Sequence, residues 1–450
     1  MIFHLNKLIH TSNKYICITR PRRFGKTVAV NMITKYYQYL ENQTTIFNDK
    51  KISKYVNWDK YLNKFNIIKL TMNNYFEDRS IEEGIKELKR KIIREVKNSI
   101  KQIELKENYF FTDLFQQIYG YTGLQIIFVI DEWDYIIRSK KEETNSHKIY
   151  LEFLNTLLKD KDYVALAYIT GILPVKKSEN QTSLNYFDEL SMISPGWTSE
   201  YIGFTNVEVE ALCTKQKTII HHERKQKQKQ KEIENDYIKS LNNNINKRQI
   251  LNGSTNNSSK KLKINTNGIR NKDVDIINNK LIYEVKEIKD KKNKKDKKDK
   301  KNEKNENIEN KGKDEFEVNF ENLKLWYNGF KLKNDYFNEY YKIYSPYSIV
   351  NALKHNKINN YWCLSETFHS VLKLIDLNFF GLKEDIILLR DGVKIKINIS
   401  SYQNDMRTFI YKDDIFTMLV HLGYLAYDTD TKLVYIPNKE IQNVFKTITF

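Results

Sequence analysis

Short runs of apolar residues alternate with helical patterns over the first 200 residues of the chain. Apolar and β-branched residues predict strands at 15–19, 66–71, 126–130 and 163–169. Helical spacing between these runs predicts helices at 28–40, 81–96 and 147–158. The run 126–130 is apolar throughout, which is typical of a parallel strand covered on both faces. This alternation predicts an α/β fold with a central, mostly parallel sheet.

The pattern becomes mainly helical after Gly203. Thr205 and Glu208 form an S/T-x-x-E capping box, and helical spacing returns at 346–353 and 368–377. These segments predict a helical lid domain, in which we expect the aromatic residues to form a packed core, although a binding face is the alternative. The aromatic residues in question are Trp326, Tyr327, Tyr344, Tyr347, Tyr361 and Trp362.

The last seventy residues mix both kinds of pattern. Short strands are expected at 393–399 and 433–436, and a helix is expected at 413–422. This combination predicts a small α+β C-terminal module.

Most of the excess positive charge lies in one segment of unusual composition. The chain has a formal net charge of +18, and residues 211–320 alone contain 29 Lys and Arg against 17 Asp and Glu. Tyr237 and Tyr283 are the only aromatic residues between Phe204 and Phe316. Such a segment cannot bury enough apolar surface to offset the conformational entropy that its chain loses on ordering. Residues 215–317 are therefore expected to be a disordered Lys/Asn-rich insertion. A nucleic-acid-binding basic arm is the alternative to a solvated spacer.

Composition also bears on the class of protein. Cys17, Cys213 and Cys363 are too few and too scattered for a disulfide framework or a zinc site. The longest apolar stretch, 164–175, is too short to span a bilayer, and the first residues lack the pattern of a secretory signal. The expectation is a soluble intracellular protein, cytoplasmic or nuclear, whose oligomeric state the sequence does not indicate.

The junction between the first strand and the first long helix carries the chemistry. Gly25, Lys26 and Thr27 match the end of the phosphate-binding G-x-x-x-x-G-K-[ST] loop. Backbone N–H groups at a helix start attract an anion, Lys26 can reach the β- and γ-phosphates, and the Thr27 hydroxyl can bind Mg²⁺. The first glycine of the motif is replaced by Arg20. The candidate nucleotide-binding residues are Arg22, Arg23, Phe24, Gly25, Lys26, Thr27, Val28 and Thr170.

A second motif completes a candidate Mg²⁺-dependent NTPase site. The apolar strand at 126–130 runs directly into Asp131 and Glu132. Asp131 is expected to join Thr27 as a metal ligand, and Glu132 to polarise the attacking water, with Lys26 assisting catalysis. Thr170 ends the next strand and is expected to sense the γ-phosphate, since ligands of open α/β sheets bind at the carboxyl ends of strands. A structural Thr-Gly turn is the alternative for Thr170.

Seven sequence blocks occur in the order of a known family. They are RPRRFGKT (20–27), VIDEWD (129–134), AYITGILPVKK (167–177), YIGFTNVEVEAL (201–212), WYNGF (326–330), YSPYSIVNAL (344–353) and NNYW (359–362). The chain thereby resembles the AAA-ATPase-like domain family, whose members are often coupled to a C-terminal PD-(D/E)XK nuclease-like domain. The resemblance implies a P-loop NTPase with a three-layer core, and it makes Arg20 part of the family's own pattern. The nuclease-like domain is expected to be lacking here.

The expected organisation has four parts. A P-loop NTPase core spans 1–203, the helical lid spans 204–214 plus 318–380, the insertion spans 215–317, and the C-terminal module spans 381–450. The expected function is Mg²⁺-dependent ATP binding and hydrolysis, with ATP and Mg²⁺ as ligands. A catalytically weak nucleotide-dependent switch and a nucleic-acid-associated protein are the alternatives. Arg22, Arg23 and Arg138 are candidates for an arginine finger, among which the sequence does not decide.

Overall fold

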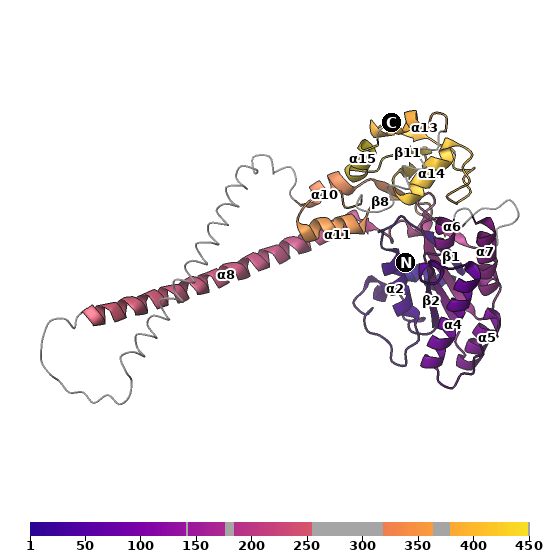
Figure 1. Ribbon diagram of the computed structural model, residues 1–450, viewed down its shortest axis with the longest axis horizontal. Helices are drawn as coiled ribbons and strands as arrows, with labels where there is room; N and C mark the ends of the chain where they lie inside the picture. The colour runs from indigo at the N-terminus through magenta and orange to yellow at the C-terminus, as the bar shows by residue number, and fades with distance from the viewer. Residues whose placement is uncertain (141–142, 176–183, 254–317, 363–378, 449–450) are drawn as a thin grey trace. The chain divides into compact units, whose positions relative to one another are not determined.

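The computed structural model describes residues 1–140, 143–175, 184–253, 318–362 and 379–448 (Figure 1). The chain divides into two units, one made of Met1–Glu210 with Val318–Phe450 and the other of Ala211–Glu317. The first unit holds a five-stranded sheet and two three-stranded sheets.

The five-stranded sheet is parallel throughout and has the order β2-β3-β4-β1-β5. Its strands are β1 (Tyr15–Thr19), β2 (Asn66–Thr71), β3 (Ile126–Asp131), β4 (Val164–Gly171) and β5 (Asp188–Leu190). Every residue of β1, β3 and β4 is buried, as expected for central parallel strands covered on both faces. The predicted α/β fold and the four predicted strands are therefore confirmed.

Helices cover both faces of this sheet. The connection from β1 to β2 runs across the sheet in one direction, and the connections from β2 to β3 and from β3 to β4 run in the other. Right-handed crossovers then place the first helix on the opposite face from the later ones. Figure 1 shows α2 (Lys26–Tyr37) on one side and α4 (Ile81–Ser99), α5 (Phe111–Thr122) and α7 (Thr144–Leu158) on the other. These layers agree with the predicted three-layer core.

Shorter elements complete the N-terminal part of the chain. They are α1 (Ile2–Leu8), α3 (Asn73–Phe76), α6 (Tyr135–Ser139) and the 3₁₀ turns η1 (Lys51–Lys54) and η2 (Gly196–Thr198).

The register of three strands brings their carboxyl ends to one edge. Thr170 of β4 pairs with Ile18 of β1 on one side and with Asp131 of β3 on the other. The loop that leaves β1 and the turn that leaves β3 therefore lie on either side of the end of β4. Polar groups from both motifs can meet there.

The region predicted as a helical lid also contains strands. Its described elements are β6 (Phe204–Thr205), α10 (Phe320–Tyr327), β7 (Phe330–Asn334), β8 (Glu339–Tyr344) and α11 (Pro346–His355). The strands form an antiparallel sheet of order β6-β8-β7. The residues of β7 alternate between buried and partly buried positions, which is the period of a strand. The helix expected at 368–377 lies outside the described residues.

Four of the six aromatic residues singled out in the sequence of this region lie in its core. Tyr327, Tyr344, Tyr361 and Trp362 are buried, whereas Trp326 and Tyr347 are partly buried. The four buried rings agree with the expectation of a packed core.

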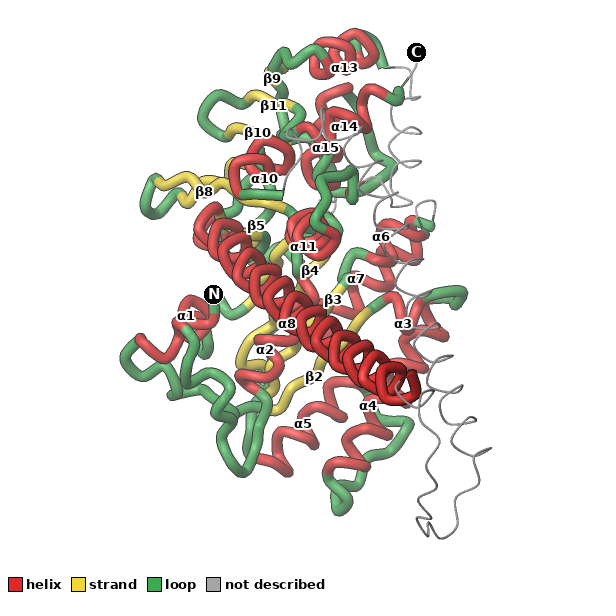
Figure 2. Tube along the Cα trace, turned by 90° about the vertical axis from the view of Figure 1, so that its left-hand side faces the viewer, coloured by secondary structure: helices red, strands yellow, loops and turns green. Residues whose placement is uncertain are grey.

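The C-terminal residues form a small α+β module, as expected. It contains α13 (Leu382–Arg390), β9 (Ile395–Lys396), α14 (Lys412–Leu422), β10 (Ala426–Asp428), β11 (Leu433–Tyr435) and α15 (Lys439–Lys446). Its strands form an antiparallel sheet of order β10-β11-β9, and Figure 2 shows them gathered with α13, α14 and α15. The strand expected over 393–399 is limited to the two residues of β9.

The structure differs from the sequence expectation at the start of the basic insertion. Residues 215–253, expected to be disordered, belong to α8 (Asn206–Gly253). The side chains at 221–233 are exposed, so local propensity rather than burial accounts for the helix: Lys, Gln, Glu and Arg are good helix formers. Residues 254–317 lie outside the described part. Within the residues that the structure describes, every helix is too short or too polar to cross a lipid bilayer.

Candidate functional site

The loop between β1 and α2 presents the start of a helix to solvent. Gly25 is the N-cap of α2 and has φ +93°, a left-handed conformation that favours glycine. The first amide of this turn with a helical partner is that of Ala29, which donates to the Gly25 carbonyl over 3.1 Å. The N–H groups of the preceding helical residues have no partner inside a helix, and the side chains of Thr27 and Val28 are exposed. This geometry suits an anion.

Lys26 is the first residue of this helix. Its ammonium donates to the carbonyl of Arg20 over 2.8 Å and to that of Pro21 over 2.9 Å. Burial lowers the pKa of Lys26 to about 8, although the carboxylates of Asp134 and Asp131 oppose this shift. Both of these acceptors are neutral carbonyl oxygens.

The two sequence motifs meet through one hydrogen bond. The Thr27 hydroxyl donates to Oδ2 of Asp131 over 2.8 Å, although the residues are 104 positions apart. Oδ1 of Asp131 accepts from the amide of Glu132 over 3.0 Å, so both carboxylate oxygens are oriented. The structure therefore brings the predicted residues Lys26, Thr27 and Asp131 together at the carboxyl edge of the sheet.

The oxygen donors of this edge fit a magnesium ion. Mg²⁺ prefers oxygen ligands and is commonly bound by one or two carboxylates together with phosphates of the substrate. Thr27 and Asp131 supply a hydroxyl and a carboxylate next to the candidate phosphate site. Among the described residues, no group of three or more His, Cys, Asp or Glu side chains could hold a metal by itself. A magnesium site here would depend on the nucleotide.

Glu132 follows Asp131 in a left-handed conformation, with φ +52°. Its side chain is 41% exposed, and its Oε2 lies 3.8 Å from Nη2 of Arg138. The backbone turn directs the chain away from β3 directly after Asp131. Glu132 thus lies beside the site with a carboxylate that solvent can reach.

Asp134 anchors the segment that contains Glu132, a role that the sequence analysis did not assign. Its Oδ2 accepts from the amides of Ile172 and Leu173 over 3.0 and 2.9 Å and from Nε of Arg138 over 2.9 Å. Gly171 is required here because a Cβ at this position would lie 2.5 Å from Oδ1 of Asp134. The i, i+4 spacing of Asp134 and Arg138 is a sequence signal that could have identified the pair.

Thr170 is placed at the expected strand end, but its hydroxyl is used inside the sheet. The side chain is fully buried, and Oγ1 donates to the carbonyl of Ile18 over 2.6 Å. In this arrangement the hydroxyl is directed at β1. The structural alternative for Thr170 agrees better with this geometry than a phosphate contact does.

Arg20 has a structural role in place of the first glycine of the motif. The side chain is buried and donates to the carbonyls of Thr19, Leu190 and Thr198 and to the Thr198 hydroxyl. Burial lowers the pKa of Arg20 to about 10. The guanidinium joins the loop to the end of β5 and to Thr198 of η2, which explains why an arginine occupies this position.

The other predicted loop residues differ in their surroundings. Arg22 is exposed, whereas Arg23 has φ +68°, lies 4.1 Å from the ring centre of Tyr347 and donates to the carbonyl of Tyr361. Phe24 is buried and packs edge-to-face on Phe330 and Trp362. Arg23 and Phe24 therefore contact the C-terminal part of the chain.

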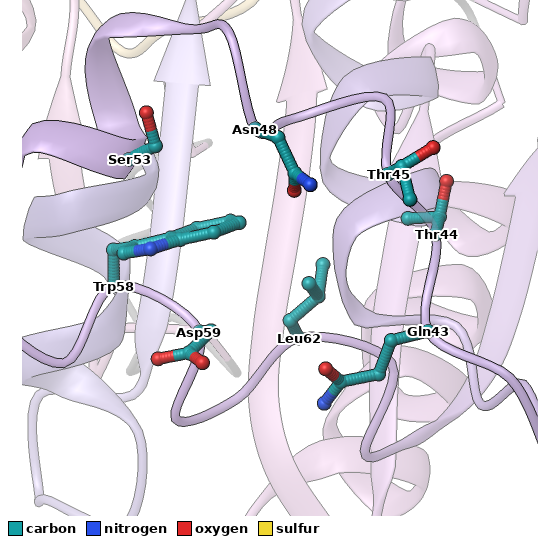
Figure 3. A pocket seen from close by; sticks show the side chains of 8 residues that line it. All are labelled: Gln43, Thr44, Thr45, Asn48, Ser53, Trp58, Asp59 and Leu62. Atoms are coloured by element: carbon teal, nitrogen blue, oxygen red, sulfur yellow. The ribbon is translucent and has the colours of Figure 1, made fainter.

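A separate hollow lies at the other end of α2. It has a volume of about 490 Å³ and is lined by Gln43, Thr44, Thr45, Asn48, Ser53, Trp58, Asp59 and Leu62 (Figure 3). The segment that forms it follows the C-terminal end of α2, whereas the motifs lie at its N-terminal end. This hollow is not part of the motif site.

One comparison with known proteins finds a family match in the part of the chain that contains both motifs. Residues 3–180 match the model of the AAA-ATPase-like family, described as a predicted AAA-ATPase. This range includes the loop after β1, the Asp131-Glu132 pair and Thr170. No curated protein matches the chain. A solved structure of C. elegans PCH-2 aligns with 49% of this chain and 44% of that chain, at 13% identity and a TM-score of 0.21. That overlap is too loose to support an argument about this protein.

Proposed function

We propose that the protein binds ATP with Mg²⁺ and hydrolyses it at the carboxyl edge of the five-stranded sheet, since residues 3–180 match the model of the AAA-ATPase-like family. The observation that carries this proposal is the hydrogen bond of 2.8 Å between Thr27 and Asp131. It joins the phosphate-loop motif to the acidic motif, as a shared nucleotide and metal site requires.

Each residue of the edge has a role in binding. The N-terminal amides of α2 and the Lys26 ammonium hold the phosphates, since both supply positive charge at one place. Thr27 and Asp131 would hold the metal, which neutralises phosphate charge when bound. The exposed side chains of Thr27 and Val28 leave the helix start open to a ligand.

Glu132 is the proposed general base. Its carboxylate accepts a proton from water as the water oxygen forms a bond to the γ-phosphorus and the bond to the bridging β–γ oxygen breaks. ADP leaves with the electron pair of the broken bond, and inorganic phosphate is the second product. The part-exposed position of Glu132 beside Asp131 is suited to this step.

Substitution of Lys26 by alanine tests the proposal. Purified wild-type protein should release phosphate from ATP in a magnesium-dependent manner, and Lys26→Ala should lower the rate about 100-fold or more because the phosphates lose their main cation. Lys35→Ala, an exposed lysine in the last turn of the same helix, is the matched control and should retain the wild-type rate.

The outcomes separate the alternatives. Stabilisation of the wild type by ATP without phosphate release, and loss of that stabilisation in Lys26→Ala, would indicate a nucleotide-dependent switch. Equal behaviour of wild type and Lys26→Ala in both assays would reject nucleotide binding at this edge.

A further inference from the structure

Arg138 lies between two carboxylates and contacts each with a different nitrogen. Its Nε donates to Oδ2 of Asp134 over 2.9 Å, and its Nη2 lies 3.8 Å from Oε2 of Glu132. The Arg138 side chain is only 11% exposed. A planar guanidinium can serve two acceptors from fixed directions, which the single ammonium of a lysine cannot do at the same time.

The contact with Asp134 fixes the position of the guanidinium. Asp134 is fully buried, and its Oδ2 also accepts from the amides of Ile172 and Leu173, directly after β4. Arg138 is thus attached to the backbone that follows the central strand. The position of Nη2 beside Glu132 follows from this attachment.

The Glu132 carboxylate has fewer restraining contacts than that of Asp131. Asp131 has partners for both carboxylate oxygens, whereas the Glu132 side chain is 41% exposed. A separation of 3.8 Å is longer than a hydrogen bond, so the charge contact restrains the carboxylate and leaves room for water at its oxygens.

We propose that Arg138 is a positioning residue that holds the Glu132 carboxylate where it accepts the proton of the attacking water. This inference rests on the proposed ATPase function. It assigns Arg138 a role within its own site, not that of an arginine finger, because the guanidinium already faces Asp134 and Glu132.

A double-mutant cycle in the full chain tests this role. Arg138→Lys keeps a charge for the buried Asp134 but releases Glu132, so kcat for ATP should fall about tenfold or more while KM stays within about twofold. Glu132→Gln should lower kcat further. Adding Arg138→Lys to Glu132→Gln should cause no additional loss, since the restrained carboxylate is already gone.

Two controls separate positioning from general stability. Arg90→Lys, at an exposed arginine of α4 that also faces a glutamate, should leave kcat and KM unchanged. The melting temperature of Arg138→Lys should stay close to that of the wild type. If the melting temperature falls strongly, the double variant Arg138→Gln with Asp134→Asn takes the place of Arg138→Lys in the cycle with Glu132→Gln. This pair removes both buried charges together.

Two results would overturn the inference. One is a kcat of Arg138→Lys equal to that of the wild type. The other is a fall in kcat on adding Arg138→Lys to Glu132→Gln that is as large as the fall on adding it to the wild type. Either result leaves the ATPase function intact, provided that the wild type turns over ATP and Lys26→Ala does not. Absence of turnover in the wild type would remove both the function and the inference.

Discussion

Lys26 titrates within the range in which ATP binding can be measured. Its pKa is about 8 because burial disfavours the charged form. The neutral amine no longer attracts phosphate, so the dissociation constant of ATP should rise above pH 8, by up to about tenfold per pH unit, as binding becomes linked to proton uptake. Titrations between pH 7.5 and 9.5, by calorimetry in buffers of different ionisation enthalpy, would measure both the affinity and the proton uptake.

The variant Lys26→Arg distinguishes the titration of Lys26 from that of other groups. A guanidinium keeps its charge to about pH 12, so the affinity of Lys26→Arg should vary little over the same range. A parallel rise of the dissociation constant in both proteins would show that another group is responsible.

The sequence predicts some site residues better than others for a physical reason. Lys26, Thr27 and Asp131 belong to local motifs whose strand and helix context is itself visible in the sequence, and the structure brings them together. The partner of Arg23 is different, because Tyr361 lies 338 positions away and no local pattern indicates it. Thr170 shows a related difficulty: its position at a strand end was predictable, but the direction of its hydroxyl depends on β1.

Helix α4 begins with a complete capping box. The Ser80 hydroxyl accepts from the Glu83 amide over 3.2 Å, and the Glu83 carboxylate accepts from the Ser80 amide over 3.2 Å. Ser80→Ala removes the first of these bonds, so we expect the free energy of unfolding to fall by about 1 kcal/mol. Urea denaturation would measure the change.

The other end of the same helix supplies the control. Ser99 is exposed and ends α4, where its hydroxyl donates to the Glu95 carbonyl without capping an amide. Ser99→Ala should change the stability by less than about 0.5 kcal/mol. Equal losses in both variants would contradict the capping interpretation.

Elements were predictable where the local pattern and the packing agree. The strands at 15–19 and 66–71 have the predicted bounds, since apolar β-branched residues suit a buried parallel sheet. The β7–β8 hairpin was missed because the lysines of β7 alternate with its apolar residues and give a weak signal. The start of helix α8 was predicted from its capping box, but its continuation beyond residue 214 was missed because the composition argument considers burial, whereas this part of the helix has little.

At the scale of the whole molecule, Glu440 joins distant segments near the C-terminus. It belongs to α15, accepts from the Ser348 hydroxyl of α11 over 2.9 Å and from the Trp362 amide over 2.7 Å. Burial raises the pKa of Glu440 to about 7. In the unfolded chain the pKa of this carboxyl is 4.5. The contribution of the protonated group to the free energy of unfolding is therefore complete below pH 4.5 and is lost as the pH rises through about 7.

Glu440→Gln should remove this loss of stability at higher pH, because the glutamine side chain does not ionise. Its amide can accept from Trp362 and donate to Ser348, so at pH 8 the variant should be up to about 3 kcal/mol more stable than the wild type. The difference should shrink towards pH 5, which thermal unfolding across pH 5–8 would measure. Glu384→Gln, at an exposed position of α13, should follow the wild type. An unchanged pH dependence in Glu440→Gln would contradict the assignment.

The pairing of β4 with both β1 and β3 limits the insertions and deletions that this strand can accept during evolution. Successive side chains of a strand alternate between faces, so gaining or losing one residue inside β4 would turn Thr170 away from the row that it forms with Ile18 and Asp131. Its aliphatic residues could be exchanged for others of similar volume with little effect. Single-codon insertions and deletions in this strand should therefore be far less tolerated than substitutions, although none of its side chains touches the substrate in the chemistry proposed above.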